Sequence, residues 1–134
     1  MYSLEEVAPG LSAYAASIKF NAHVAQDTST WEHLVREFFN YLSYHIKELP
    51  QAVIGHLKGY LNLEEKGYYY FSNVGSQAGT NVIGEASGQI RDARLDLNVL
   101  VFNLDIEQIS GLVQQAIAKY FPCMTKFIEE KNEA

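Results

Sequence analysis

Cysteine is nearly absent from this sequence, and long hydrophobic runs are absent altogether. The single cysteine, Cys123, cannot form an internal disulfide, which excludes a disulfide-stapled secreted scaffold and fits a reducing compartment. No apolar run approaches the ~20 residues that a membrane-spanning helix needs. Glu5 and Glu6 stand where a secretory signal would carry basic residues, and residues 3–7 predict only a short helical turn. We therefore expect a cytoplasmic protein with no membrane association.

Positive charge is also scarce. Ten lysines and arginines face sixteen aspartates and glutamates, which leaves a formal net charge of −6. An acidic surface repels phosphate backbones, and no basic cluster interrupts it, so we expect no nucleic-acid partner. With 134 residues, 48% of them hydrophobic and 19% charged, the composition is that of a globular chain. The simplest prediction is one domain, residues 1–134, with a frayed acidic tail at about residues 129–134.

The clearest pattern occupies residues 94–121. Apolar and polar side chains alternate over residues 95–101, the period of a half-buried strand. Apolar residues then recur at steps of three and four over residues 106–121, as on one face of a helix. Asp105 suits the N-cap, and Gln108 completes a capping box. A strand followed directly by an amphipathic helix predicts a sheet with a helix packed on one face.

A second strand and helix are predicted nearer the N-terminus. Residues 14–24 alternate between apolar and polar side chains, which favours a strand, although the alanines in this run also permit a helix. Ser29 and Glu32 form the S-x-x-E pattern of a capping box. The following helix is therefore expected to run from Trp31 to about Leu49.

Aromatic residues are abundant, with nine tyrosines and seven phenylalanines. Phe39, Tyr41 and Tyr44 widen the apolar arc of the 31–49 helix beyond what one sheet face requires. Two interpretations remain open. The rings belong either to a thick aromatic core or to a contact with a second subunit, since tyrosine is frequent at interfaces. The second interpretation predicts a homo-oligomer, most simply a dimer, with these three residues at the interface.

The middle of the chain combines a clear hairpin with an irregular segment. Residues 53–71 predict a β-hairpin of two strands around a polar turn. Gly55 and Gly59 lie among the inward residues of its first strand, where glycine indicates a bulge or the close approach of a helix. From Ser72 to Asp92 the pattern dissolves between repeated glycines, apart from a possible short strand at residues 80–86. This segment is either a functional loop or a mobile connection.

The predicted fold class is α+β. The element order is β-α-β-β-(β)-β-α, an antiparallel sheet of four to five strands with two main helices packed on one face. A ferredoxin-like sandwich is the nearest common plan, although no candidate for its usual final strand follows the second helix.

The face of the sheet away from the helices holds the candidate site. Its predicted polar residues are His56, Arg94, Asp96 and Asn98, and the same face also holds Lys19, Lys58 and Tyr60. This face is either solvated, as in many antiparallel sheets, or a surface that binds a ligand or another copy of the sheet. In the second interpretation, Gly75 and Gly79 of the glycine-rich loop present backbone amides to the ligand. Acid–base catalysis by His56 and Asp96 would require these two side chains to meet.

Metal and cofactor sites are not predicted. His33 and His45 are twelve residues apart, which separates them by about 120° around a helix, so they cannot share an ion. His23 and His56 both lie on predicted outer faces and could meet only if their strands are neighbours. The glycine-rich loop matches neither the P-loop nor the dinucleotide-binding pattern.

The run Ile54-Gly55-His56-Leu57-Lys58-Gly59 resembles accessory regions associated with CobW-type metallochaperone GTPases, and the resemblance extends over about a third of the chain. It implies a component that acts beside such a GTPase in metal delivery. Because this chain has no P-loop, nucleotide hydrolysis would belong to the partner.

These observations rank the possible functions. The leading hypothesis is a non-enzymatic, small cytoplasmic binding or accessory protein that self-associates, since no stretch carries a complete catalytic signature. The alternatives are a small-ligand-binding or enzymatic domain that uses the outer sheet face and the Gly75–Gly88 loop, or the accessory component of a metal-delivery GTPase system.

Overall fold

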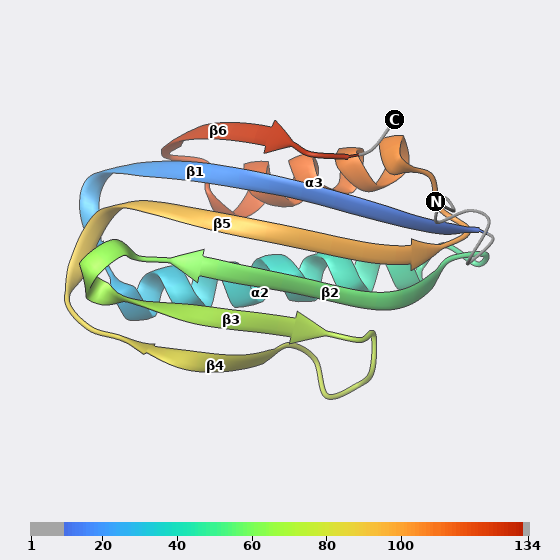
Figure 1. Cartoon of the computed structure of the whole chain (residues 1–134), viewed down its shortest axis with the longest axis horizontal. Helices are drawn as coiled ribbons and strands as arrows, with labels where there is room; N and C mark the ends of the chain where they lie inside the picture. The colour runs from blue at the N-terminus through green and yellow to red at the C-terminus, as the bar shows by residue number, and fades with distance from the viewer. Residues whose placement is uncertain (1–9, 133–134) are drawn as a thin grey trace, which may run out of the picture.

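The computed structural model describes residues 10–132, and every structural statement below concerns these residues. One antiparallel sheet of six strands, in the order β4-β3-β2-β5-β1-β6, carries two helices on one face (Figure 1). The elements are β1 (Leu11–Asp27), α2 (Thr28–Lys47), β2 (Val53–Asn62), the 3-10 turn η1 (Glu64–Lys66), β3 (Gly67–Asn73), β4 (Asn81–Ala86), β5 (Gln89–Phe102), α3 (Ile106–Tyr120) and β6 (Met124–Glu130). The α+β class is confirmed, but the sheet is larger than the predicted four to five strands. The helical turn expected at residues 3–7 lies outside the described residues.

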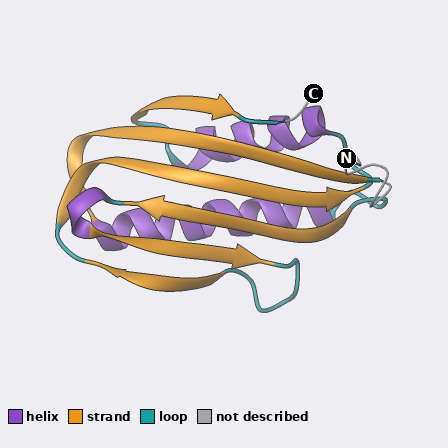
Figure 2. Ribbon diagram, in the orientation of Figure 1, coloured by secondary structure: helices purple, strands orange, loops and turns teal. Residues whose placement is uncertain are grey.

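The chain connections explain why both helices share one face. Helix α2 joins β1 to β2, and these two parallel strands border β5 on either side. Helix α3 joins β5 to β6, which border β1 in the same way. Crossovers between parallel strands are almost always right-handed. The two crossovers start from antiparallel strands and run in opposite directions across the sheet, so the same hand places both helices on the same face. Figure 2 shows this two-layer arrangement.

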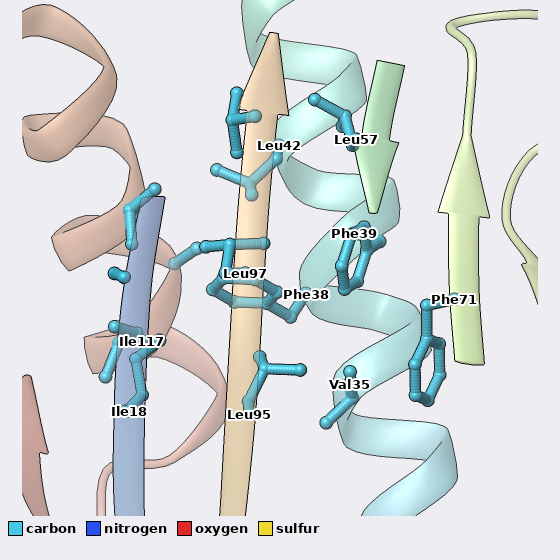
Figure 3. Packing of buried hydrophobic residues seen from close by; sticks show 14 of the residues in the cluster. Ile18, Val35, Phe38, Phe39, Leu42, Leu57, Phe71, Leu95, Leu97 and Ile117 are labelled. Carbon is cyan, nitrogen blue, oxygen red and sulfur yellow. The ribbon is translucent and has the colours of Figure 1, made fainter. Parts of the chain in front are cut away.

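The core lies between the helices and the inner face of the sheet. Phe39 of α2 is fully buried, and its ring stacks on Phe71 of β3 with 5.6 Å between ring centroids (Figure 3). A Cβ atom at Gly59 would lie 2.7 Å from Cζ of Phe39, so a side chain of α2, rather than the helix backbone, approaches this glycine closely. The assignment of Phe39 to a subunit interface is wrong, because this ring is enclosed by the core.

The two helices begin differently. Asp105 and Gln108 form the predicted capping box of α3, with the Gln108 backbone amide donating to Asp105 Oδ1 at 2.8 Å and the Asp105 backbone amide to Gln108 Oε1 at 3.1 Å. The capping box predicted for α2 is wrong. The strand β1 continues to Asp27 and the helix begins at Thr28, so Ser29 already lies within the first turn. Glu32 instead holds Arg36 at 2.8 Å.

Strand structure extends further than the sequence pattern suggested. The segment from Ser72 to Asp92 is mostly paired, because β4 forms the suggested extra strand and β5 already begins at Gln89. The chain after α3 forms the strand β6, for which the sequence offered no candidate, and its Glu129 and Glu130 pair with Ser17 and Ala16. Fraying from residue 129 is therefore wrong, because β6 satisfies the backbone groups along the edge of β1.

The alternation of buried and exposed side chains along β1 fails at one position. Tyr14, Ala16, Ile18, Phe20 and Ala22 are buried as the alternation predicted, but Val24 is 71% exposed. The register of β1 against β5 shifts between Asn21 and Gln26, and such an irregularity breaks the alternation of faces. Among the described residues, neither helix is long and apolar enough to cross a membrane.

Candidate binding site on the open sheet face

Two rows of side chains cross the sheet face that the helices leave open. The aromatic row contains Ile83, Tyr70, Tyr60 and Asp96, which are direct partners across β4, β3, β2 and β5. The polar row contains Asn81, Ser72, Lys58 and Asn98, which are partners across the same four strands. The two rows are two residues apart along each strand, which separates them by about 7 Å.

These eight side chains line a hollow with a volume of ≈ 570 Å³. Small-molecule sites typically range over about 300–1,000 Å³ and combine apolar walls with a few polar groups. Gly59 and Phe71 also line the hollow. The Phe71 side chain is buried in the core, so these two residues contribute their backbone to the floor of the hollow. The hollow therefore has the size and the mixed lining of a small-molecule site.

The tyrosines form the apolar side of this hollow. The Tyr60 and Tyr70 ring centroids are 4.9 Å apart, and Tyr68 contacts Tyr70 edge-on at 5.5 Å. Large parts of Tyr70 (49%) and Ile83 (61%) remain exposed to water. Exposed rings that gather in one place on an uncovered sheet face are typical of an interaction surface.

The charged groups around the hollow are unequally satisfied. Asp96 accepts a hydrogen bond from the Ser17 hydroxyl at 2.9 Å and lies 3.3 Å from the Arg94 guanidinium. Lys58, by contrast, forms no ion pair with any other residue in the range 10–132. Burial, and then the nearby Lys58 ammonium, lower the pKa of His56 below its usual value. The negative charge of the hollow is therefore compensated and its positive charge is not.

The predicted site residues are only partly brought together. Asp96 and Asn98 line the hollow, whereas Arg94 lies one row beyond it and holds Asp96. His56 lies on the other side, opposite Leu100, which is four residues from Asp96 along β5. That separation is on the order of 13 Å, so His56 and Asp96 cannot act as a hydrogen-bonded acid–base pair.

The glycine-rich loop faces the helix layer instead of the hollow. The Lys47 ammonium of α2 donates to the Gly75 carbonyl at 3.0 Å, and a Cβ at Gly79 would contact Asn40 of the same helix. Thr80 also donates to Asn40 Oδ1 at 2.6 Å. The prediction that Gly75 and Gly79 join the outer-face site is therefore wrong, because hydrogen bonds to α2 hold the loop on the other side of the sheet.

The remaining aromatic candidates lie on the helix layer. Tyr44 is 59% exposed, whereas Tyr41 packs between His45, at 4.1 Å, and Tyr120, at 5.8 Å. These two tyrosines reach the protein surface, in contrast to the buried Phe39. Both belong to α2, which packs on the side of the sheet opposite to the open face (Figure 1).

A metal site finds no support in the described part of the chain. His23 lies near the end of β1 and His56 near the start of β2, and β5 runs between these strands. Across residues 10–132 no group of three or more histidine, cysteine, aspartate or glutamate side chains could hold a metal ion. Cys123 is exposed in the turn between α3 and β6.

The run that resembles GTPase-accessory regions lies on β2. Packing explains both of its glycines, since a Cβ at Gly59 would meet Phe39 and one at Gly55 would approach the Leu100 carbonyl at 3.2 Å. His56 lies at a register shift next to Gly55, and Lys58 lines the hollow.

No family model matches the chain, and no curated protein or solved structure matches it significantly. The residues of the hollow that the sequence pattern missed are Tyr70, Ser72, Asn81 and Ile83. Alternation along β3 separates Tyr70 from Tyr69, but only the hairpin register shows that Tyr70 lies beside Tyr60. No sequence signal indicated that β4 would add Asn81 and Ile83.

Proposed function

We propose that this chain is a non-enzymatic cytoplasmic binding or accessory protein that self-associates, and that a second copy covers the open sheet face. The observation that carries the proposal is the gathering of Tyr68, Tyr70 and Ile83, all exposed, on the face without helices. A monomer that exposes such a patch gains apolar burial when a partner covers it. A two-fold dimer presents the same patch from both subunits, so the tyrosine rings of one copy would pack against those of the other.

Charge supports a second copy as the occupant. By strand register, this face carries three cationic side chains and four carboxylates, namely Lys19, Lys58, Arg94, Glu85, Asp92, Asp96 and Glu129. The face is therefore close to neutral although the whole chain has a formal charge of −6. Two copies repel each other less through this face than through the more acidic remainder of the surface.

The size of the face is also adequate. Six strands spaced at about 4.8 Å, with edge strands of six and seven residues, give a projected area on the order of 600 Å². Standard interfaces bury about 800 Å² of accessible surface per partner, and accessible surface is larger than the projected area of the same face. A face-to-face pair of sheets therefore falls within the range of stable dimers.

Sedimentation velocity at micromolar concentration tests this proposal. We expect a dimer for the wild type, a monomer for Tyr70→Glu and a dimer for Tyr44→Glu. The two substitutions are matched, because Tyr70 is 49% exposed on the sheet face and Tyr44 is 59% exposed on the helix layer. A glutamate at Tyr70 would bring two like charges into a closed interface, whereas one at Tyr44 would remain in water.

Two results would contradict the proposal. A wild type that sediments as a monomer throughout would remove self-association altogether. A dimer that survives Tyr70→Glu but dissociates with Tyr44→Glu would move the interface to the helix layer around Tyr41 and Tyr44.

We also infer a relationship to the ferredoxin-like sandwich. The strand order β6-β1-β5-β2, with α2 and α3 as crossovers, supports this relationship, and β3 and β4 would then be an added hairpin. The pairing of Ile18 with Ile128 supplies the final strand that the sequence pattern lacked. A cross-strand NMR contact between the backbones of these two residues tests it, and loss of that contact would remove the final strand from the scheme.

A second candidate function, small-molecule binding, is favoured by the hollow itself. Its volume of ≈ 570 Å³ and its mixture of rings and amides lie within the range of small-molecule sites. This use does not need a second copy. Ligand-induced shifts in the backbone amide NMR signals of β2 and β3 would test it directly.

A further inference from the structure

We infer that the hollow on the open sheet face binds a small organic acid, with the ring of the ligand against Tyr60 and Tyr70 and its carboxylate at Lys58. This inference rests on the proposal that the hollow takes a small molecule, and it applies to a chain whose open face is not covered by a second copy.

Four polar side chains of the hollow are unused. The side chains of Lys58, Ser72, Asn81 and Asn98 form no hydrogen bond or ion pair with other residues of the described chain. These four residues are the polar row, so their donors lie side by side across adjacent strands. Lys58 lies between Ser72 and Asn98 on the neighbouring strands, so its ammonium, a hydroxyl and an amide can together hold a carboxylate by charge-assisted hydrogen bonds.

The charge pattern selects an anion. A cationic ligand would have to use Asp96, but Ser17 and Arg94 already satisfy that carboxylate at 2.9 and 3.3 Å. Lys58 has no such partner in the described residues, and its ammonium contributes to the lowered pKa of His56. With a single free cation among the described residues that line it, the hollow suits a monoanion such as a carboxylate more than a doubly charged phosphate.

The spacing of the rows selects the shape of the ligand. The aromatic row supplies Tyr60, Tyr70 and Ile83 as an apolar wall, and rings pack well on rings at about 4.5–7 Å. The polar row lies about 7 Å further along the strands, so about two or three atoms should separate the ring of the ligand from its carboxylate. An arylalkanoate such as 3-phenylpropanoate has this form.

Backbone amide NMR titrations of the full chain test the inference with three probes. We expect 3-phenylpropanoate to shift the signals of residues in the hollow, and to bind at least several-fold more tightly than 3-phenylpropanamide, which has the same ring without the charge. Butanoate, which has the charge without the ring, should bind more weakly than 3-phenylpropanoate as well.

Three variants locate the carboxylate. Lys58→Gln should weaken 3-phenylpropanoate binding by about tenfold, the usual effect of losing a charged hydrogen bond, without changing the affinity for the amide. Lys58→Arg should retain the preference for the acid. Lys119→Gln is the matched control, because Lys119 lies on α3 beside Tyr120 in the helix layer, and it should bind as the wild type does.

The outcomes separate this inference from the function on which it rests. If the acid and the amide bind equally and Lys58→Gln changes neither affinity, the anion preference is wrong while the hollow remains a ligand site. If neither aromatic probe shifts any signal of the hollow, both the inference and the small-molecule function are refuted.

Discussion

Replacing Gly59 by alanine tests how α2 is seated on the sheet. The added Cβ would lie 2.7 Å from Cζ and 3.0 Å from Cε2 of Phe39, and 3.1 Å from Leu95. Phe39 cannot swing away, because its ring stacks on Phe71 at 5.6 Å and meets Phe38 edge-on at 5.6 Å. The helix or the strand must therefore shift to admit one methyl group.

The expected loss of stability follows from two opposing terms. Overpacking a closed core destabilises by about 1–3 kcal/mol, whereas replacing a strand glycine by alanine returns about 0.5–1 kcal/mol of backbone entropy. We expect Gly59→Ala to lower the free energy of unfolding by about 1–2 kcal/mol, which corresponds to about 4–7 °C in Tm for a chain of this length. Urea denaturation followed by the fluorescence of Trp31, the single tryptophan and a fully buried one, measures this change.

A matched glycine and a second substitution make the test specific. Gly111 lies exposed on α3, and an added Cβ there would have no heavy atom within 4 Å, so Gly111→Ala should stabilise the protein by about 0.5–1 kcal/mol. In a Phe39→Leu background the penalty of Gly59→Ala should shrink, because the clashing ring is gone. A Gly59→Ala variant as stable as the wild type would refute the proposed contact between α2 and β2.

Two further predictions concern helix capping and pH. Asp105→Ala should destabilise the protein by about 1 kcal/mol because it breaks the capping box of α3. Asp27→Ala should cost less, because this side chain makes no cap bond and accepts only an exposed hydrogen bond from Gln89; equal losses in urea denaturation would contradict this. The lowered pKa of His56 means that the unfolded chain binds a proton more readily than the folded one as the pH falls through about 6.5. Stability should therefore decrease from about pH 7.5 to about pH 5, and His56→Gln should reduce that decrease; an unchanged pH dependence would show that His56 is not responsible.

Local periodicity predicted the faces of the elements more reliably than their lengths. The alternation around Leu95 and Leu97 and the helical stripe through Ile109 and Val113 identified buried residues correctly, because burial repeats with the geometry of the backbone. Strand ends depended on pairing between distant segments. No local pattern predicted the strand that begins at Met124, which pairs with the edge of β1.

The candidate site was predictable only in part, for the same reason. Period two placed Asp96 and Asn98 on the open face, but it could not show that Arg94 and His56 fall on opposite sides of the hollow. It also gave no information about which way the 74–80 loop would fold. That choice depends on a hydrogen bond that Lys47 donates to the loop and one that Asn40 accepts from it, and both residues are distant in the sequence.

The hairpin formed by β3 and β4 converts a sheet edge into a site. Without it, β2 would border solvent, and Lys58 and Tyr60 would stand on an exposed edge with no wall beyond them. Strand β3 adds Tyr70 to the aromatic row and a hydroxyl to the polar row, and Ile83 on β4 closes the far side. Because β3 contributes Phe71 to the core as well, the hollow is held on rigid backbone. The strands β3 and β4 thus supply half of the lining on which both proposed uses of the open face depend.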